Sequence, residues 1–258
     1  MSLSTFITER IKITSKTKPL ERPIPTSKDE LRSLIEQELE RQGTDADLNH
    51  IDVSGIENMS FLFNKLNIRN IKIDEWDTSK VTNMNSMFAY CRKFEGTGLE
   101  KWDVSNVRDI SNMFAYCKNF NGDLSSWKLP KITSLYLTFH KCSNFIGTGL
   151  ENWDVSNIND MSYAFSGCKS LIADFSYWDV SNVSQMQYAF KECESLDCDL
   201  SSWATKVSRV LDMSYAFYKC KNLHCDLSGW KLSKFAGTNK AFGACTKMTS
   251  TLLPKIPN

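Results

Sequence analysis

Hydrophobic positions recur along most of this chain with a period of about 25 residues. Tryptophan marks one position of the period, with successive gaps of 25 to 27 residues, at Trp76, Trp102, Trp127, Trp153, Trp178, Trp203 and Trp230. Phenylalanine marks a second position, at Phe63, Phe88, Phe114, Phe139, Phe165, Phe190, Phe217 and Phe242. Cysteine follows this phenylalanine by three residues in seven of the eight units. Three ladders with one period predict a tandem repeat of eight units over about residues 50–246.

Each unit changes its pattern partway along. In the unit WDVSNVRDISNMFAYCKNFNGDL, apolar residues from Val107 to Cys117 are spaced three and four apart. This spacing predicts a one-sided helical segment of two to three turns, with Ser105 or Asn106 as its cap and Asp109 in a capping box. The following run from Asp123 to Trp127 is compatible with a short strand.

One short strand and one short helical segment in each 25-residue coil is the leucine-rich-repeat arrangement. We therefore expect an α/β repeat, a leucine-rich-repeat-like solenoid of about eight coils with an inner parallel sheet. Stacking the coils would place Trp on Trp, Phe on Phe and Cys on Cys in one continuous core.

The segments outside the repeats have other patterns. Residues 28–42, KDELRSLIEQELERQ, place apolar side chains on one face after a possible N-cap at Ser27, which predicts an amphipathic helix. We expect residues 27–49, which comprise this helix and a linker, to cap the first coil. The alternative is that the helix binds a partner or dimerises. Residues 1–26 are rich in proline and basic residues, which predicts a flexible or loosely docked arm. Residues 247–258 are expected to close the last coil.

The repeat unit WDVSNVxxMxxMFxxCxxFxxDLSxW resembles the units of BspA-like leucine-rich-repeat surface proteins of bacteria, a family that also occurs in some protists and phage genomes. The resemblance covers about residues 26–250, including the segment PTSKDELRSLIEQELERQGTDADLNHIDVS before the first unit. It implies a solenoid with a role in adhesion or protein binding. Since we find no signal peptide or membrane anchor, we expect a cytoplasmic protein, with the cell surface or secretion as the alternative.

The residues that could carry catalysis are scattered. The ladder cysteines lie one to a unit, without CxxC pairs, and the three histidines occupy different repeat positions. We therefore predict no enzyme, no metal and no cofactor, and read the ladder cysteines as buried thiols in a reducing compartment. Cys198 and Cys225 lie at equivalent positions of adjacent units and are a candidate redox pair, although two unpaired thiols remain the alternative.

Aspartates form two further ladders, after the tryptophan and before the strand-like run. Calcium binding is one interpretation, because calcium prefers several carboxylate oxygens together. The interpretation we favour is that each aspartate binds backbone N–H groups of its own turn.

Two surfaces are candidates for a partner. The variable residues beside the tryptophans would project from the inner sheet, and the candidates are Glu100, Lys101, Glu151, Asn152, Tyr177 and Ser202. A basic edge would follow the cysteine ladder, at Arg92, Lys93, Lys118, Lys141, Lys169, Lys191 and Lys219. The alternative for both sets is an ordinary solvated surface.

Overall charge limits the choice of partner, because 31 Lys+Arg against 30 Asp+Glu gives a formal net charge of +1. A uniformly basic nucleic-acid binder is thereby disfavoured, and no exposed aromatic ladder is evident beside the basic edge. We predict a non-enzymatic protein-binding repeat scaffold that uses its inner face or its basic edge, with an acidic surface as a possible target. The alternatives are a surface adhesin exported by a non-standard route, or a metal- or thiol-dependent enzyme.

Overall fold

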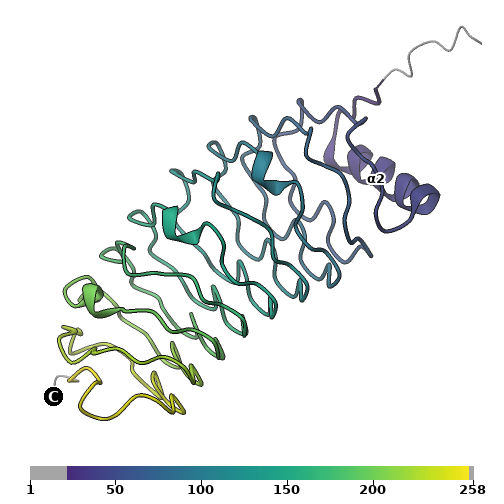
Figure 1. Ribbon diagram of the computed structural model, residues 1–258. Helices are drawn as coiled ribbons and strands as arrows, with labels where there is room; N and C mark the ends of the chain where they lie inside the picture. The colour runs from purple at the N-terminus through teal and green to yellow at the C-terminus, as the bar shows by residue number, and fades with distance from the viewer. Residues whose placement is uncertain (1–21, 256–258) are drawn as a thin grey trace, which may run out of the picture.

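The protein is a stack of coils with an α-helix across its N-terminal end (Figure 1). The computed structural model describes residues 22–255, so most of the predicted N-terminal arm and the end of the closing segment lie outside the described residues. In chain order the elements are α2 (Lys28–Gln42) and three single-turn 3-10 helices, η1 (Leu99–Lys101), η2 (Leu150–Asn152) and η3 (Ser201–Trp203). We number the coils by the phenylalanine ladder, from Phe63 in the first to Phe242 in the eighth.

The predicted strand and helix in every coil are wrong. Within residues 22–255 there is one α-helix and no β-strand. Neighbouring coils are joined by isolated parallel bridges, for example Asn58 with Asn83 and Asp160 with Gln185. The protein is therefore not the expected α/β, leucine-rich-repeat-like solenoid with an inner sheet, but a stack of coils built almost wholly from turns.

Backbone hydrogen bonds explain why the predicted helical segment does not form. In the third coil, Cys117 N–H donates to Phe114 O at 2.9 Å within its own turn. The N–H groups of Phe114 and Tyr116 instead donate to carbonyls of the fourth coil, at 2.9 and 2.7 Å. In an α-helix each backbone N–H donates to the carbonyl four residues earlier. A segment in which every second N–H donates to the next coil therefore cannot be helical. Asp109, predicted in a capping box, accepts the N–H of Ser111 at 2.8 Å.

Every coil contains a pair of residues with a left-handed backbone that lie four positions apart and flank the ladder phenylalanine. They are Phe61 and Lys65, Ser86 and Tyr90, Asn112 and Tyr116, Leu137 and Lys141, Tyr163 and Gly167, Tyr188 and Glu192, Tyr215 and Lys219, and Lys240 and Ala244. Only Asn112 and Gly167 are residue types that favour this conformation. For the others it costs on the order of 1 kcal/mol each, and the hydrogen bonds between coils hold them there.

The core repeats the sequence ladders in space. Neighbouring ladder phenylalanines stack with ring centroids 5.0 to 5.6 Å apart through all eight coils. Each tryptophan donates its indole N–H to a carbonyl of the preceding coil, as Trp178 does to Leu150 at 2.8 Å. Each ladder cysteine donates its S–H to the preceding phenylalanine carbonyl, as Cys142 does to Phe114 at 2.9 Å. The polar atoms of the large core side chains are thus satisfied by the stacking itself.

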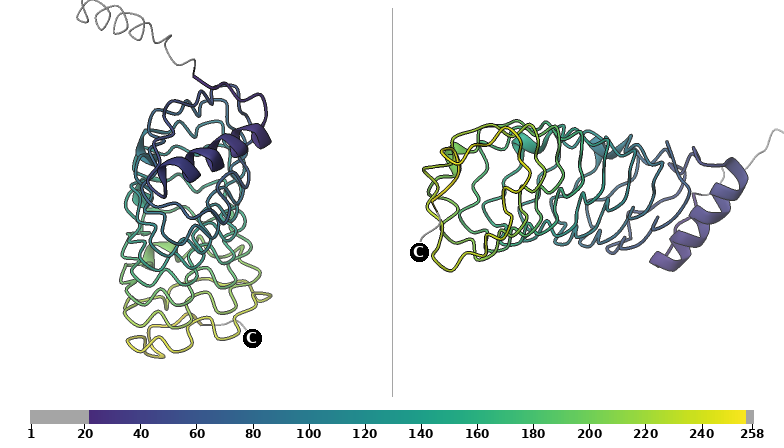
Figure 2. Two further views of the ribbon diagram at one scale, coloured as in Figure 1. Left: turned by 90° about the vertical axis from the view of Figure 1, so that its right-hand side faces the viewer. Right: turned by 90° about the horizontal axis from the view of Figure 1, so that it is seen from below.

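Helix α2 lies across the first coil (Figure 2). Its residues Leu31 and Ile35 are fully buried, and the predicted N-cap is confirmed, since Ser27 Oγ accepts the N–H of Glu30 at 3.2 Å. Arg32 donates to the carbonyl oxygens of Phe61 at 2.8 Å and Leu62 at 3.0 Å. These contacts cover the apolar end of the stack and satisfy carbonyls of the first coil that face no preceding coil. In the described part of the chain, no helix has the length and apolar character that a membrane span requires.

Candidate interaction surface

A row of aromatic side chains crosses six consecutive coils; its two N-terminal tyrosines are exposed, its three C-terminal tyrosines are half-buried and its histidine is buried. We call it the aromatic file, and its members are Tyr90, Tyr116, His140, Tyr163, Tyr188 and Tyr215. All five tyrosines occupy the left-handed turn positions. In the second and third coils the tyrosine follows the ladder phenylalanine by two residues, and in the fifth to seventh it precedes it by two. His140, one residue after Phe139, connects the two halves.

The rings of the aromatic file contact one another rather than standing apart. Tyr163 and Tyr188 stack with centroids 4.6 Å apart and an interplanar angle of 12°, and Tyr188 and Tyr215 at 5.0 Å and 4°. Tyr90 and Tyr116 stack in the same way at 4.6 Å and 7°. Both faces of Tyr188 are therefore covered, and the aromatic file offers a partner ring edges and hydroxyl groups. Within residues 22–255, none of the five tyrosine hydroxyls has a hydrogen-bond partner that would occupy it.

His140 lies at the centre of the aromatic file with its ring nearly perpendicular to those of Tyr116 and Tyr163, at 83° and 89°. Its side chain is buried, and Nδ1 is the one buried side-chain nitrogen or oxygen in the described chain without a hydrogen-bond partner. Burial, aided by the charge of Lys141, lowers the pKa of His140 to about 4. The imidazole is therefore neutral at physiological pH.

Lysines gather around one glutamate beside the aromatic file. Glu192 lies 3.3 Å from Lys141 Nζ, 3.7 Å from Lys191 Nζ and 3.8 Å from Lys219 Nζ. Partial burial acts to raise the pKa of Glu192, but the three lysines outweigh it and hold that pKa below its usual value. Lys191 Nζ also lies 5.6 Å from the ring centroid of Tyr188, which joins this lysine cluster to the aromatic file.

Several lysines of the predicted basic edge are neutralised by ion pairs. Glu192 pairs with Lys141, Lys191 and Lys219. Glu194 pairs with Lys169 and Lys221. Among the residues that the structure describes, the N-terminal members of the edge form no ion pair; these are Arg92, Lys93 and Lys118. Sequence reasoning missed the two glutamates because they come from a single coil and have no ladder of their own.

The predicted inner-face residues do not lie on a sheet. Most belong to the single-turn 3-10 helices: Glu100 and Lys101 to η1, Glu151 and Asn152 to η2, and Ser202 to η3. Lys101 Nζ pairs with Asp74 at 2.6 Å, and Ser202 Oγ donates to Ser176 O at 2.6 Å. Tyr177 is 81% exposed. None of the six belongs to the aromatic file.

The expectation that no exposed aromatic ladder accompanies the basic residues is wrong for Tyr90 and Tyr116, which are exposed, whereas the other three tyrosines of the row are half-buried. The tyrosines are visible in the sequence as FAYC twice and as YAF three times. They stand at two different repeat positions, so they form one row only because the left-handed turns and His140 bring these positions together. That convergence has no signature in the spacing.

The two aspartate ladders have the turn chemistry that we favoured. Asp103 accepts the N–H of Ser105 at 2.9 Å, and Asp123 accepts that of Ser125 at 2.8 Å. Each of the other aspartates likewise accepts the backbone N–H of the residue two positions later. Across residues 22–255, no three His, Cys, Asp or Glu side chains are grouped so that they could hold a metal ion.

All nine cysteines are free thiols. Burial raises the pKa of Cys91 to about 12 and shifts the other ladder cysteines in the same direction. Burial also raises the pKa of Cys198, to about 12, and that of Cys225. The two thiols of the predicted redox pair are thus protonated near neutral pH, and their pairing stays a prediction.

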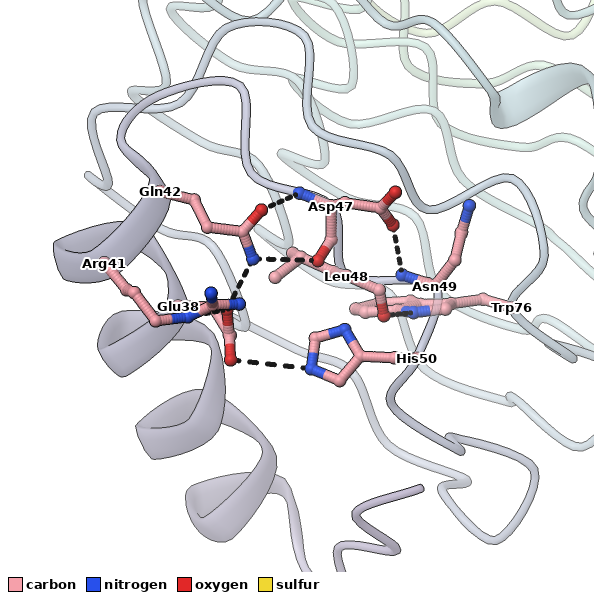
Figure 3. Close-up of polar contacts among 8 residues, drawn as sticks. All are labelled: Glu38, Arg41, Gln42, Asp47, Leu48, Asn49, His50 and Trp76. Carbon is pink, nitrogen blue, oxygen red and sulfur yellow. Dashed lines mark hydrogen bonds and ion pairs between the residues drawn. The ribbon is translucent and has the colours of Figure 1, made fainter. Parts of the chain in front are cut away.

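A second polar cluster fixes α2 to the first coil (Figure 3). Glu38 accepts hydrogen bonds from Arg41 and Gln42 and lies 3.5 Å from His50 Nε2. The amide of Gln42 in turn binds the backbone N–H of Asp47 at 3.0 Å and its carbonyl at 3.2 Å. Since these groups are occupied with one another, this cluster is a structural junction between the helix and the coils.

Comparison with known proteins identifies the family to which this chain is similar. A family model described as "Mycoplasma protein of unknown function, DUF285" matches residues 33–148 and again residues 133–254. No curated protein matches the chain. A solved structure described as "Crystal structure of TLR13-ssRNA13 complex" aligns with 81% of this chain at 11% identity and a TM-score of 0.15, too low to support any conclusion. The chain spans 45% of that structure's chain.

Proposed function

We propose that this chain, which belongs to the repeat family described as "Mycoplasma protein of unknown function, DUF285", is a non-enzymatic scaffold that binds a protein partner along the aromatic file. The observation that carries this proposal is the row of exposed and half-buried tyrosines whose hydroxyls have no partner within residues 22–255.

Tyrosine suits this role because it supplies a large contact area and a hydrogen-bonding group with little side-chain entropy to lose. Mutual stacking reduces that loss further, since Tyr188 is already held between Tyr163 and Tyr215. A partner would therefore meet a rigid surface, and preorganisation of this kind lowers the cost of binding.

The resemblance of the repeat unit to BspA-like surface proteins supports a binding role and, within it, adhesion. The free thiols favour a reducing compartment instead, because ladder cysteines in adjacent coils could otherwise be oxidised. Protease treatment of intact cells distinguishes the two locations, since degradation of the protein would establish exposure at the surface.

Site-specific photo-crosslinking tests the proposed function. We would place a photoreactive phenylalanine analogue at Tyr163 or Tyr188 in the full chain and irradiate it in an extract of the organism that encodes it. Tyr177 is the matched control, because it is a more exposed tyrosine outside the aromatic file. We expect one discrete adduct from the two file positions and none from Tyr177. Adducts from Tyr177 alone would favour the predicted inner face, and no adduct at any position would refute a protein partner at either surface.

A further inference from the structure

We infer that the segment recognised by the aromatic file is an extended acidic polypeptide, whose carboxylates contact the lysines beside the file in competition with Glu192. This inference rests on the proposed function and adds the chemistry of the partner to it.

The charge beside the C-terminal half of the aromatic file is positive. Lys191 Nζ is 5.6 Å from the ring centroid of Tyr188, and Lys240 Nζ is 5.8 Å from that of Tyr215. Lys141 and Lys219 approach from the two sides of Glu192. These four lysines against one glutamate leave a local charge of +3, whereas the chain as a whole carries +1. The excess is therefore concentrated where the tyrosine hydroxyls are free.

The shape of the aromatic file fits an extended segment. It is one ring wide and advances by steps of 4.6 to 5.9 Å between centroids from coil to coil. Five such steps make a row of roughly 25 Å, which about eight residues of extended chain would cover at ~3.3 Å each. A segment of this kind can meet tyrosine hydroxyls and lysines along its whole length, while a globular acidic surface would touch only part of the row.

The ring geometry disfavours single-stranded nucleic acid, the other polyanion of similar shape. Proteins that bind it hold the bases on open aromatic faces. Here Tyr188 lies between Tyr163 and Tyr215 with interplanar angles of 12° and 4°, so neither of its faces can receive a base. Carboxylates bind hydroxyl and ammonium groups; the aromatic file presents hydroxyls at its ring edges, and the lysines beside it supply the ammonium groups.

Glu192 gives the inference a specific consequence. Its side chain is 20% exposed, and its carboxylate forms ion pairs with Lys141, Lys191 and Lys219. An acidic partner must therefore displace or share these ion pairs, and removing the charge of Glu192 should make binding tighter. A merely structural role for Glu192 predicts the opposite.

Fluorescence anisotropy with a labelled decaglutamate peptide tests the inference on the full chain. We expect wild-type protein to bind decaglutamate and not decaglutamine. The pair K191E/K219E should weaken binding at least about tenfold and E192Q should strengthen it about threefold, because close charge pairs govern affinity of this kind. K128E/K231E is the matched control: it makes the same charge change at two exposed lysines, each directly after a ladder tryptophan and away from the aromatic file, and should alter binding less than about twofold.

Several results would overturn the inference. Weaker binding by E192Q, equal effects of K128E/K231E and K191E/K219E, or tighter binding of a ten-nucleotide oligouridylate than of decaglutamate would each do so. If K191E/K219E does not fold, judged by its thermal transition, K191Q/K219Q replaces it with the same expected direction. An adduct at Tyr188 together with equal affinity for decaglutamate and decaglutamine would reject an acidic partner and leave the proposed function standing. Failure of the proposed function would appear instead as the absence of any adduct.

Discussion

Lys141 and Glu192 form an ion pair at 3.3 Å although they lie two coils apart, and Gly167 in the coil between them makes this possible. A Cβ atom on Gly167 would lie 2.7 Å from Lys141 Cδ. The second left-handed position of the fifth coil thus lacks a side chain where the lysine side chain crosses it.

Substitution of Gly167 by alanine is expected to destabilise the protein by roughly 1–2 kcal/mol, because alanine at a φ of 82° is strained and its methyl group displaces Lys141. In a K141A background the steric part of this loss should disappear. Urea unfolding of the two single variants and the double variant measures the coupling between the sites. Gly229, where a Cβ would have its nearest neighbour at 3.9 Å, is the control, and additive effects of G167A and K141A would contradict the interpretation.

His140 should make the protein less stable in mild acid. Its pKa is about 4 in the folded state against 6.5 as the ordinary value, so the unfolded chain binds the proton more readily. The contribution to stability is fully present above pH 6.5 and is lost as the pH falls towards 4, by up to about 3 kcal/mol. Urea unfolding between pH 7 and 4.5 measures this loss.

The variant H140F tests the role of His140 by removing its titratable imidazole. Phenylalanine removes the unpartnered Nδ1 and keeps an aromatic ring between Tyr116 and Tyr163. We expect it to stabilise the protein by about 1 kcal/mol at pH 7 and to reduce the pH dependence above pH 4.5. Unchanged pH dependence in H140F would show that other groups cause the acid sensitivity.

Truncation of a ladder phenylalanine should be among the most destabilising changes. Phe139 is fully buried, with ring centroids 5.6 Å from Phe114 and 5.4 Å from Phe165. F139A is expected to cost about 3–5 kcal/mol, as large-to-small changes in a close-packed core do. Y177A, at a side chain that is 81% exposed, should change the free energy of unfolding by less than about 0.5 kcal/mol. A similar shift of the thermal midpoint for both would contradict the described core.

The ladder thiols should be unreactive in the native protein. They are buried, and burial raises their pKa, to about 12 for Cys91 and about 11 for Cys245. Titration with a coloured disulfide reagent at pH 8 should find all nine thiols in denaturant and only the partly exposed Cys198 in the native state, reacting slowly because its raised pKa keeps it protonated. The variant C198S should abolish that reaction, and rapid modification of several thiols in C198S would show that the coils open.

The sequence by itself determined the number of repeats and the composition of the core. A tryptophan, a phenylalanine and a cysteine that recur at one period must stack, because no single coil can bury them alone. The sequence also determined α2 and its cap at Ser27, since amphipathic spacing and N-capping are local properties. The aspartate turns are local in the same sense, for each carboxylate binds an N–H only two residues away.

Only the tertiary structure decided the backbone within each coil and the surface that it presents. The apolar spacing from Val107 to Cys117 is compatible with a helix as well as with the observed turns. In the structure, however, the N–H of Tyr116 donates to the carbonyl of His140 in the next coil. Residues such as Tyr116 are then held left-handed against their own preference, which no composition signals. Those turns bring tyrosines from two repeat positions into one row. The row depends on hydrogen bonds between residues about 25 positions apart, so the sequence pattern of a single unit could not predict it.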